Sequence, residues 1–176
     1  MTSPSLEEIY NQYKNRVYNL ALHYVGRTED AEEITQDVFV AVYQSMDAFK
    51  NESSIYTWIH KITINKSLDF IKSRKRKKRW GAMTSIFQYD AESAQKDFIE
   101  LQHPGIEMEQ KETMNAIYRG IQTLPDQQKT ALLLNKIDGQ SHSEIAEIME
   151  TSPKAVESLI QRAKKNLTDW LKKNEG

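Results

Sequence analysis

Apolar residues recur at intervals of three and four along most of the chain, the period of amphipathic α-helices. The first such stretch opens at Ser5 and Glu8, a capping-box pattern, and closes at Gly26, which suits a helix C-terminus. Its inward-facing positions are Leu6, Tyr10, Tyr13, Val17, Leu20, Ala21 and Tyr24. The pattern predicts a long amphipathic helix at the start of the chain.

Two more helices are predicted before residue 80. We expect Thr28 to cap the second helix, whose acidic first turn suits a helix N-terminus. Its inward-facing positions are Ala31, Ile34, Val38, Ala41 and Val42. A polar break over residues 51–54 precedes a third long helix, which runs from about Ile55 into a basic segment. Three helices with short connections form a small bundle.

The periodicity is lost between about residues 81 and 111, where acids surround scattered apolar residues and a Pro-Gly pair. This composition predicts an acidic, flexible linker. Helical spacing resumes near Glu112, and Pro125 suits the first position of a further helix that ends near Gly139. Because no strand pattern is convincing, we expect an all-α fold: a helical domain over 1–80, a linker over 81–111 and a second helical domain over 112–176.

Residues 142–165 have the layout of a helix-turn-helix. We expect Ser143 to cap a short helix, residues 150–152 to form the turn and Pro153 to start the second helix. Val156, Ile160, Ala163 and Leu167 fall on the inward face of that helix, which leaves Lys154, Glu157, Ser158, Gln161, Arg162 and Lys165 outward. Polar groups followed by cations suit a helix that reads the major groove. An ordinary αα-hairpin is the alternative: small Ala146 favours the DNA-binding motif, and Glu150 in place of a turn glycine counts against it.

Composition excludes several classes of protein. The 176 residues include no cysteine, so disulfides and thiol catalysis are excluded. No apolar run approaches the ~18 residues of a membrane span, and no signal-peptide pattern occurs, so we expect a cytoplasmic protein without membrane insertion. The four histidines are dispersed and no glycine-rich phosphate loop is present. We therefore expect no metal site, no cofactor and no enzymatic activity.

The net charge of −1 conceals a sorting of charge along the chain. Seven of the eight residues from Lys72 to Arg79 are basic, whereas acids dominate residues 90–112. Such sorting points to partner surfaces, and a basic run next to aromatic residues is compatible with nucleic acid.

Several segments, in this order and separation, resemble the extracytoplasmic-function (ECF) RNA polymerase sigma factors of the sigma-70 family. Residues 26–39 look like the region 2.2 signature of the family, and residues 57–65 with Asp69 and the basic run look like regions 2.3 and 2.4. Leu124-Pro125 with Gly139, residues 143–146 and residues 156–163 look like region 4.

The resemblance implies two partners: core RNA polymerase, through the coiled coil of its largest subunit and its flap, and promoter DNA. An anti-sigma factor is a further expectation from the family. The expected polymerase contacts lie on the second helix, whose outward stripe we assign to Asp30, Glu33, Gln36, Asp37 and Val40. The resemblance implies that the residues in contact with polymerase are Asp30, Glu33, Gln36, Asp37 and Phe39, the last of which is not part of that stripe. A merely solvated helix face is the alternative.

The same resemblance assigns −10 recognition and melting to the third helix, where aromatic, amide and cationic groups can catch a flipped base and hold the backbone. The expected −10 contacts are Tyr56, Trp58, Lys61, Asn65, Lys66, Arg74, Arg76 and Lys77. For Trp58, packing as a core anchor is the competing and favoured role. His60 and Lys61 stand where the family often has an aromatic residue and an arginine.

Recognition of the −35 element is assigned by resemblance to the helix that starts at Pro153. The expected contacts are Lys154, Ser158, Gln161, Arg162 and Lys165. Glu157 and Leu159 depart from the basic residues that relatives often carry, so the −35 sequence preference does not transfer. The predicted function is promoter-specific transcription initiation with core polymerase. The alternative is a helix-turn-helix regulator that binds DNA without polymerase.

Overall fold

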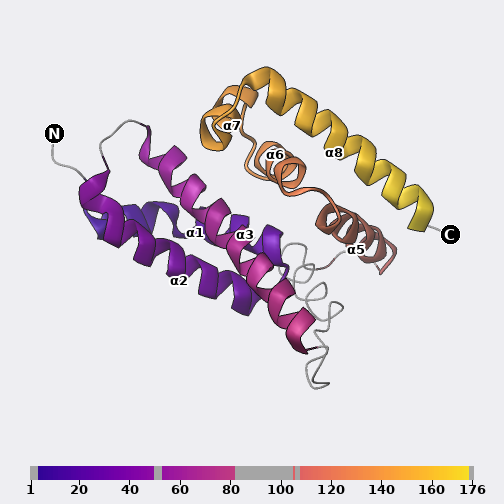
Figure 1. The fold of residues 1–176 in the computed structure, drawn as a ribbon, viewed down its shortest axis with the longest axis horizontal. Coiled ribbons are helices and arrows are strands. Elements are labelled where there is room, and N and C mark those ends of the chain that lie inside the picture. Colours follow the sequence, from indigo (N-terminus) through magenta and orange to yellow (C-terminus); the bar gives the residue numbers. More distant parts are fainter. Residues whose placement is uncertain (1–3, 50–52, 82–104, 106–107, 175–176) are drawn as a thin grey trace. The chain divides into compact units, whose positions relative to one another are not determined.

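The structure is a computed structural model of the chain, and it describes residues 4–49, 53–81, 105 and 108–174. Every regular element within these ranges is helical, as expected (Figure 1). The chain divides into two compact units, residues 1–94 and 95–176. This division falls inside the predicted linker, most of which (residues 82–104, 106 and 107) lies outside the described residues.

The first unit is a bundle of α1 (Leu6–Val25), α2 (Thr28–Ser45) and α3 (Ile55–Gly81), with a short 3-10 turn, η1 (Met46–Ala48), after α2 (Figure 1). The capping box at its start is confirmed: the Glu8 N–H donates to the Ser5 hydroxyl over 3.2 Å, and the Ser5 N–H donates to the Glu8 carboxylate over 2.7 Å. Gly26 ends α1 in the left-handed conformation, with φ of 73°. This sharp end turns the chain directly into α2.

Two local predictions for this unit are wrong. Arg27, and not Thr28, is the N-cap of α2, and no side chain caps this helix end. Tyr10 is exposed, and Ile9 takes the buried position in its place. The rest of the predicted stripe holds, since Val17, Leu20, Ala21 and Tyr24 are buried; Tyr10 lies at its edge, where its ring packs on Phe39 of α2.

Leu20, Ile34 and Ile59 come from the three helices and are fully buried in the core of the first unit. The buried side of α3 also carries polar groups. Thr63 and Ser67 are completely buried, and their hydroxyls each donate to the carbonyl four residues earlier over 2.8 Å. Because these hydroxyls are paired within α3 itself, they can be buried without a cost in unmet hydrogen bonds.

The second unit consists of α5 (Met108–Gln122), α6 (Asp126–Lys136), α7 (His142–Met149) and α8 (Pro153–Asn174). In Figure 1, α8 is the long helix of this unit, and α5, α6 and α7 all pack on it. α5 begins four residues before the predicted restart at Glu112, inside the predicted linker. Pro125 is the N-cap of α6 and not its first residue. Leu124, Leu132 and Ala163 form the buried cluster that joins α6 to α8.

The helix-turn-helix is confirmed, with one correction. Ser141, and not Ser143, caps α7: its hydroxyl accepts the Glu144 N–H over 3.3 Å, and its own N–H donates to the Glu144 carboxylate over 2.8 Å. The turn passes through Glu150, which adopts the left-handed conformation at φ 55°. Val156, Ile160 and Ala163 are buried and Leu167 packs beside them, as the spacing predicted.

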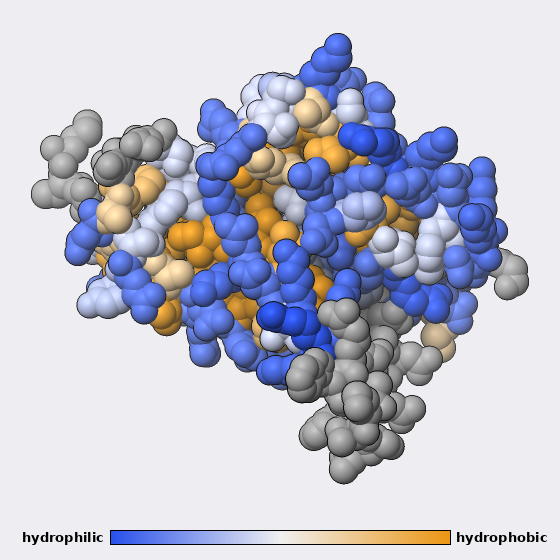
Figure 2. All heavy atoms as spheres, in the orientation of Figure 1, coloured by the Kyte–Doolittle hydropathy of each residue, from blue (hydrophilic) through white to orange (hydrophobic). Residues whose placement is uncertain are grey.

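On the face drawn in Figure 2, hydrophilic residues cover most of the described surface, and apolar atoms are visible between them. No helix among the described residues has the length and apolar character needed to cross a membrane.

Candidate nucleic-acid interface

One side of α3 points away from the bundle and combines an aromatic ring, an amide and cations. We define this α3 outer face as Trp58, Lys61, Asn65, Lys72 and Arg76, which recur at helical spacing. Asn65, Lys72 and Arg76 are exposed, whereas Trp58 and Lys61 are half-buried. From Lys61 to Arg76 the face extends for about 22 Å at the rise of an α-helix. Asp69 is also exposed on this line, between Asn65 and Lys72, so the face carries three cations and one acid. Its length and its excess of cations suit the backbone of a nucleic-acid strand.

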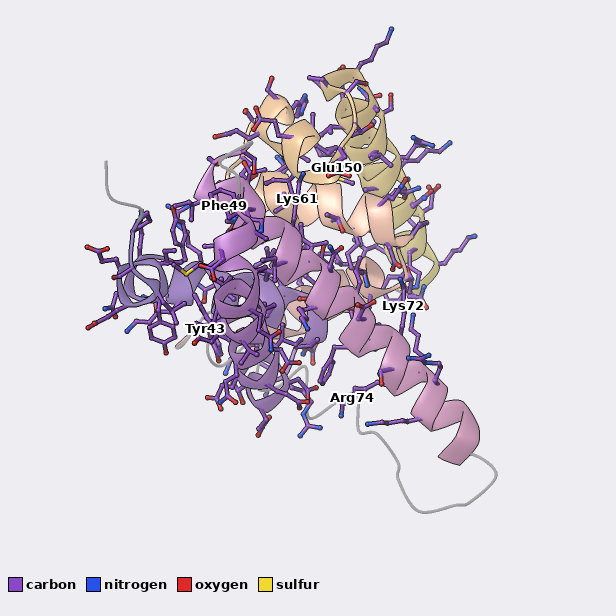
Figure 3. The ribbon with its side chains drawn as sticks, turned by 60° about the vertical axis from the view of Figure 1, so that its left-hand side comes forward. Tyr43, Phe49, Lys61, Lys72, Arg74 and Glu150 are labelled. Atoms are coloured by element: carbon purple, nitrogen blue, oxygen red, sulfur yellow. The ribbon has the colours of Figure 1, made fainter. Side chains whose placement is uncertain are left out.

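Arg74, which the sequence analysis grouped with the −10 contacts, does not lie on this face. Its guanidinium pairs with the Asp30 carboxylate of α2 and also lies over the Phe70 ring, 5.5 Å from the ring centre. Figure 3 shows Lys72 and Arg74 leaving α3 on opposite sides. The reason is helical geometry, because two residues correspond to a rotation of roughly 200°.

The same ion pair corrects the expected outward position of Asp30. Only 8% of this residue is exposed. Burial raises the pKa of the Asp30 carboxyl above its ordinary value, and the Arg74 and Arg27 guanidinium groups oppose that rise. Asp30 thus links two helices within the bundle.

The two aromatic residues predicted to contact the −10 element lie in different surroundings. The Tyr56 ring packs on His60, with 4.0 Å between ring centres, and the Arg16 cation lies 5.5 Å from it. Tyr56 is therefore on the bundle side of α3 and separate from the α3 outer face. Trp58 is half-buried and stacks one face on Phe49, with 4.6 Å between ring centres and an interplanar angle of 24°, which fits its favoured role as a packing residue.

Lys66 and Lys77 are not on the α3 outer face either. Lys66 is half-buried and Lys77 is exposed, and both are rotated away from the line of Asn65 and Arg76. Lys72 lies on the α3 outer face, although the sequence analysis did not name it among the expected −10 contacts. Its separation of eleven residues from Lys61, three full helical turns, is the signal that could have identified it.

A second surface lies on α2. Glu29, Glu33, Gln36, Val40 and Tyr43 recur at helical spacing and are all exposed, and we name them the α2 outer face. Val40 and Tyr43 are 53% and 67% exposed, so this face presents apolar area next to its acids. Asp37 is exposed beside this face. Phe39 is instead buried, and its ring packs edge-on against Tyr10 at 4.8 Å.

The third surface is the exposed side of α8. All five residues predicted for −35 recognition are exposed there, namely Lys154, Ser158, Gln161, Arg162 and Lys165. Ser158 and Arg162 each donate to the carbonyl four residues earlier, over 3.1 and 3.2 Å. Leu159 is buried and serves the core, so it cannot reach DNA. The outward orientation that the helical spacing predicted for these residues is confirmed.

Taken together, an acidic face with exposed apolar residues, a largely cationic helix face and a helix-turn-helix are the features of a DNA-binding protein. Within the described residues no group of three or more acidic or histidine side chains is placed to hold a metal ion.

Comparison with known proteins specifies the class further. Residues 9–77 match the family model for sigma-70 region 2, and residues 114–167 match that for sigma-70 region 4. The ECF RNA polymerase sigma-E factor of Haemophilus influenzae is 30% identical over 158 residues, which cover 89% of this chain and 82% of the relative. That of Escherichia coli K12 is 29% identical over 153 residues, covering 87% and 79%. The chain belongs to the ECF RNA polymerase sigma factors of the sigma-70 family.

Solved structures agree on the fold. The sigma factor RpoE, in complex with the anti-sigma factor NepR from Bartonella quintana, matches with a TM-score of 0.66 at 18% identity and covers 96% of this chain and 97% of that one. CnrH in complex with the cytosolic domain of CnrY gives the same TM-score and identity, covering 96% and 88%. The prediction of a sigma factor that directs promoter-specific transcription is confirmed, and a stand-alone helix-turn-helix regulator is not favoured.

Proposed function

We propose that the two units divide the work of promoter recognition: the first binds core RNA polymerase and the −10 element, and the second reads the −35 element. The observation that carries this division is the exposure of two separate DNA-compatible faces, one on α3 and one on α8. Each face lies on a helix that the bundle behind it holds in place.

Polymerase binding is assigned to the α2 outer face. Its acids, Glu29 and Glu33, suit a basic partner helix, while Val40 and Tyr43 offer apolar area that a partner can bury. Asp37 extends the acidic surface. Asp30 and Phe39, which were also predicted as contacts, contribute indirectly, because each is buried and fixes the position of α2 within the bundle.

The −10 element is assigned to the α3 outer face. Trp58 is half-buried and stacks on Phe49, and we assign the other face of its ring to base stacking. Asn65 can donate to and accept from a base edge, and Lys61, Lys72 and Arg76 can hold successive phosphates. This arrangement suits a single strand, which exposes its bases to stacking.

The −35 element is assigned to α8 as the recognition helix. Ser158 and Gln161 lie near its N-terminal end, where a recognition helix meets base edges, and Arg162 and Lys165 follow on the next turns. We further propose that the protein acts in the cytoplasm, performs recognition without catalysing a reaction of its own, and is held inactive by an anti-sigma factor. The solved relatives that are bound to anti-sigma factors support the last point.

The test is a pair of variants that separate the two activities. Combining Glu33→Lys with Gln36→Lys should abolish co-elution with core polymerase, whereas Arg162→Ala should leave co-elution intact and weaken binding to −35 DNA by the resulting holoenzyme. Glu7→Lys is the matched charge-reversal control, since Glu7 is exposed on α1. Unimpaired assembly of the α2 variant, or lost assembly of Arg162→Ala, would contradict the division of labour.

A further inference from the structure

The recognition helix carries one acid among its cations. Between Pro153 and Lys165, Glu157 is the only acidic residue, and Lys154, Arg162, Lys164 and Lys165 surround it in sequence. Glu157 is exposed on the DNA-compatible side of α8, on the turn that also carries Lys154 and Ser158. A carboxylate at this place faces phosphate repulsion in every DNA complex, so its presence calls for a compensating contact.

The surroundings of Glu157 leave its carboxylate available for such a contact. No ion pair within the described residues includes it; instead the Gln161 amide donates to its Oε1 over a long 3.4 Å. The second carboxylate oxygen takes part in no hydrogen bond within the described part of the chain. Gln161 lies one turn further along the same side of α8, so these two side chains reach the groove as neighbours.

The chemistry of the base edges decides what such a carboxylate can accept. An ionised carboxylate only accepts hydrogen bonds. In the major groove, guanine presents two acceptors, and thymine presents an acceptor and a methyl group. Neither base can therefore donate a hydrogen bond to the carboxylate. Cytosine presents a single amino donor, and adenine presents an amino donor beside the N7 acceptor. Cytosine is therefore the base with a donor and no adjacent acceptor.

We propose that Glu157 is a specificity-determining residue that selects cytosine at one position of the −35 element, with Gln161 steadying its carboxylate. The inference rests on the proposed role of α8 as the −35 recognition helix. It supplies a sequence preference where the family resemblance supplies none, because relatives often carry a basic residue at this place.

The experiment is selection of DNA by the holoenzyme from a promoter library with a randomised −35 region. The wild-type protein should enrich cytosine over guanine or thymine at one position, by about ten-fold or more, as one good base contact provides. Glu157→Ala should lose the preference at that position alone. Glu157→Gln should shift it towards adenine, which a side-chain amide can contact in bidentate fashion.

Glu147→Gln is the matched control, because Glu147 is an exposed acid on α7, outside the recognition helix. It should leave the whole selected motif unchanged. A motif that is identical for wild type, Glu157→Ala and Glu157→Gln would overturn the role of Glu157 while leaving −35 recognition by α8 in place. The absence of any −35 motif for the wild-type holoenzyme would overturn the proposed role of α8 itself, so the two failures are distinguishable.

Discussion

Arg74 of α3 pairs with Asp30 of α2, and this contact joins the helix of the basic segment to the helix of the acidic face. The two residues are 44 positions apart in sequence. Asp30 is buried, while the Arg74 side chain is 36% exposed and can be solvated by water. Loss of the pair therefore costs more free energy at the carboxylate than at the guanidinium. The Asp30–Arg74 pair therefore fixes the second half of α3 against α2.

Removal of the arginine should destabilise the first unit. Arg74→Ala leaves a buried carboxylate without its principal cation, which costs about 1–3 kcal/mol of the free energy of unfolding. Adding Asp30→Asn in the same chain should restore part of that loss, because a neutral amide is cheaper to bury. Thermal unfolding of both variants provides the measurement. An Arg74→Ala protein as stable as wild type would exclude a structural role for the pair.

The pair also predicts a dependence on pH. Burial already raises the pKa of the Asp30 carboxyl, and loss of Arg74 removes a group that opposes the rise. A carboxyl whose pKa is raised in the folded state favours folding when protonated and loses this contribution as the pH rises through that pKa. The deficit of Arg74→Ala should thus be largest near neutral pH and shrink on acidification. A deficit that grows towards acid pH would contradict the assignment.

The cap of the helix-turn-helix gives a second prediction. The backbone N–H and hydroxyl of Ser141 donate to Glu144 and lower the pKa of its carboxyl. The stabilisation from this carboxylate is present above its ordinary pKa and is lost as the pH falls through the lowered value. Ser141→Ala should raise the Glu144 titration midpoint, followed by NMR, and cost about 1 kcal/mol of stability. Ser143→Ala is the control, and an equal effect of both substitutions would contradict the observed cap.

This serine pair illustrates what the sequence could and could not predict. Both Ser141 and Ser143 precede the apolar run of α7, and periodicity alone cannot choose between caps that lie two residues apart. Long periodic stretches, such as the inward face of α8, were predicted correctly because several buried residues agree on one face.

Long-range pairing explains the errors in the candidate sites. Asp30 and Arg74 each look like solvent-facing charges within their own helices, and only the packing of α3 on α2 brings them together. The burial of Phe39 likewise depends on a residue far away in sequence, since its neighbour Tyr10 comes from α1. The exposed members of the three faces, by contrast, follow from helical spacing, because one buried residue is enough to show which side of the helix faces the core.

Close contact between α5 and α8 gives a third prediction. A Cβ atom added at Gly120 would lie 2.5 Å from Leu167 Cδ1 and 2.9 Å from Trp170 Cε3. Gly120→Ala should therefore push α5 from α8 and destabilise the second unit by about 1–3 kcal/mol. Combining it with Leu167→Ala should cost less than the sum of the two single substitutions, because the smaller side chain makes room. Strictly additive losses in chemical denaturation would argue against this contact.

The α3 outer face yields a fourth prediction. Lys72→Ala should weaken promoter binding by the holoenzyme and reduce the steepness of its salt dependence by about one ion. Lys136→Ala is the matched control, since Lys136 is exposed on α6, outside the three faces. Titrations at several salt concentrations measure both. A salt dependence unchanged by Lys72→Ala, or lowered equally by the control, would remove Lys72 from the DNA-binding surface.

The central claim is that this chain gives core RNA polymerase its choice of promoter. Run-off transcription with purified core polymerase and a library of genomic promoters tests it most directly. We predict discrete transcripts that start at a small set of promoters, that require the chain, and that disappear when it carries Glu33→Lys and Gln36→Lys. The same transcripts from core polymerase alone, or none when the chain is present, would contradict the account.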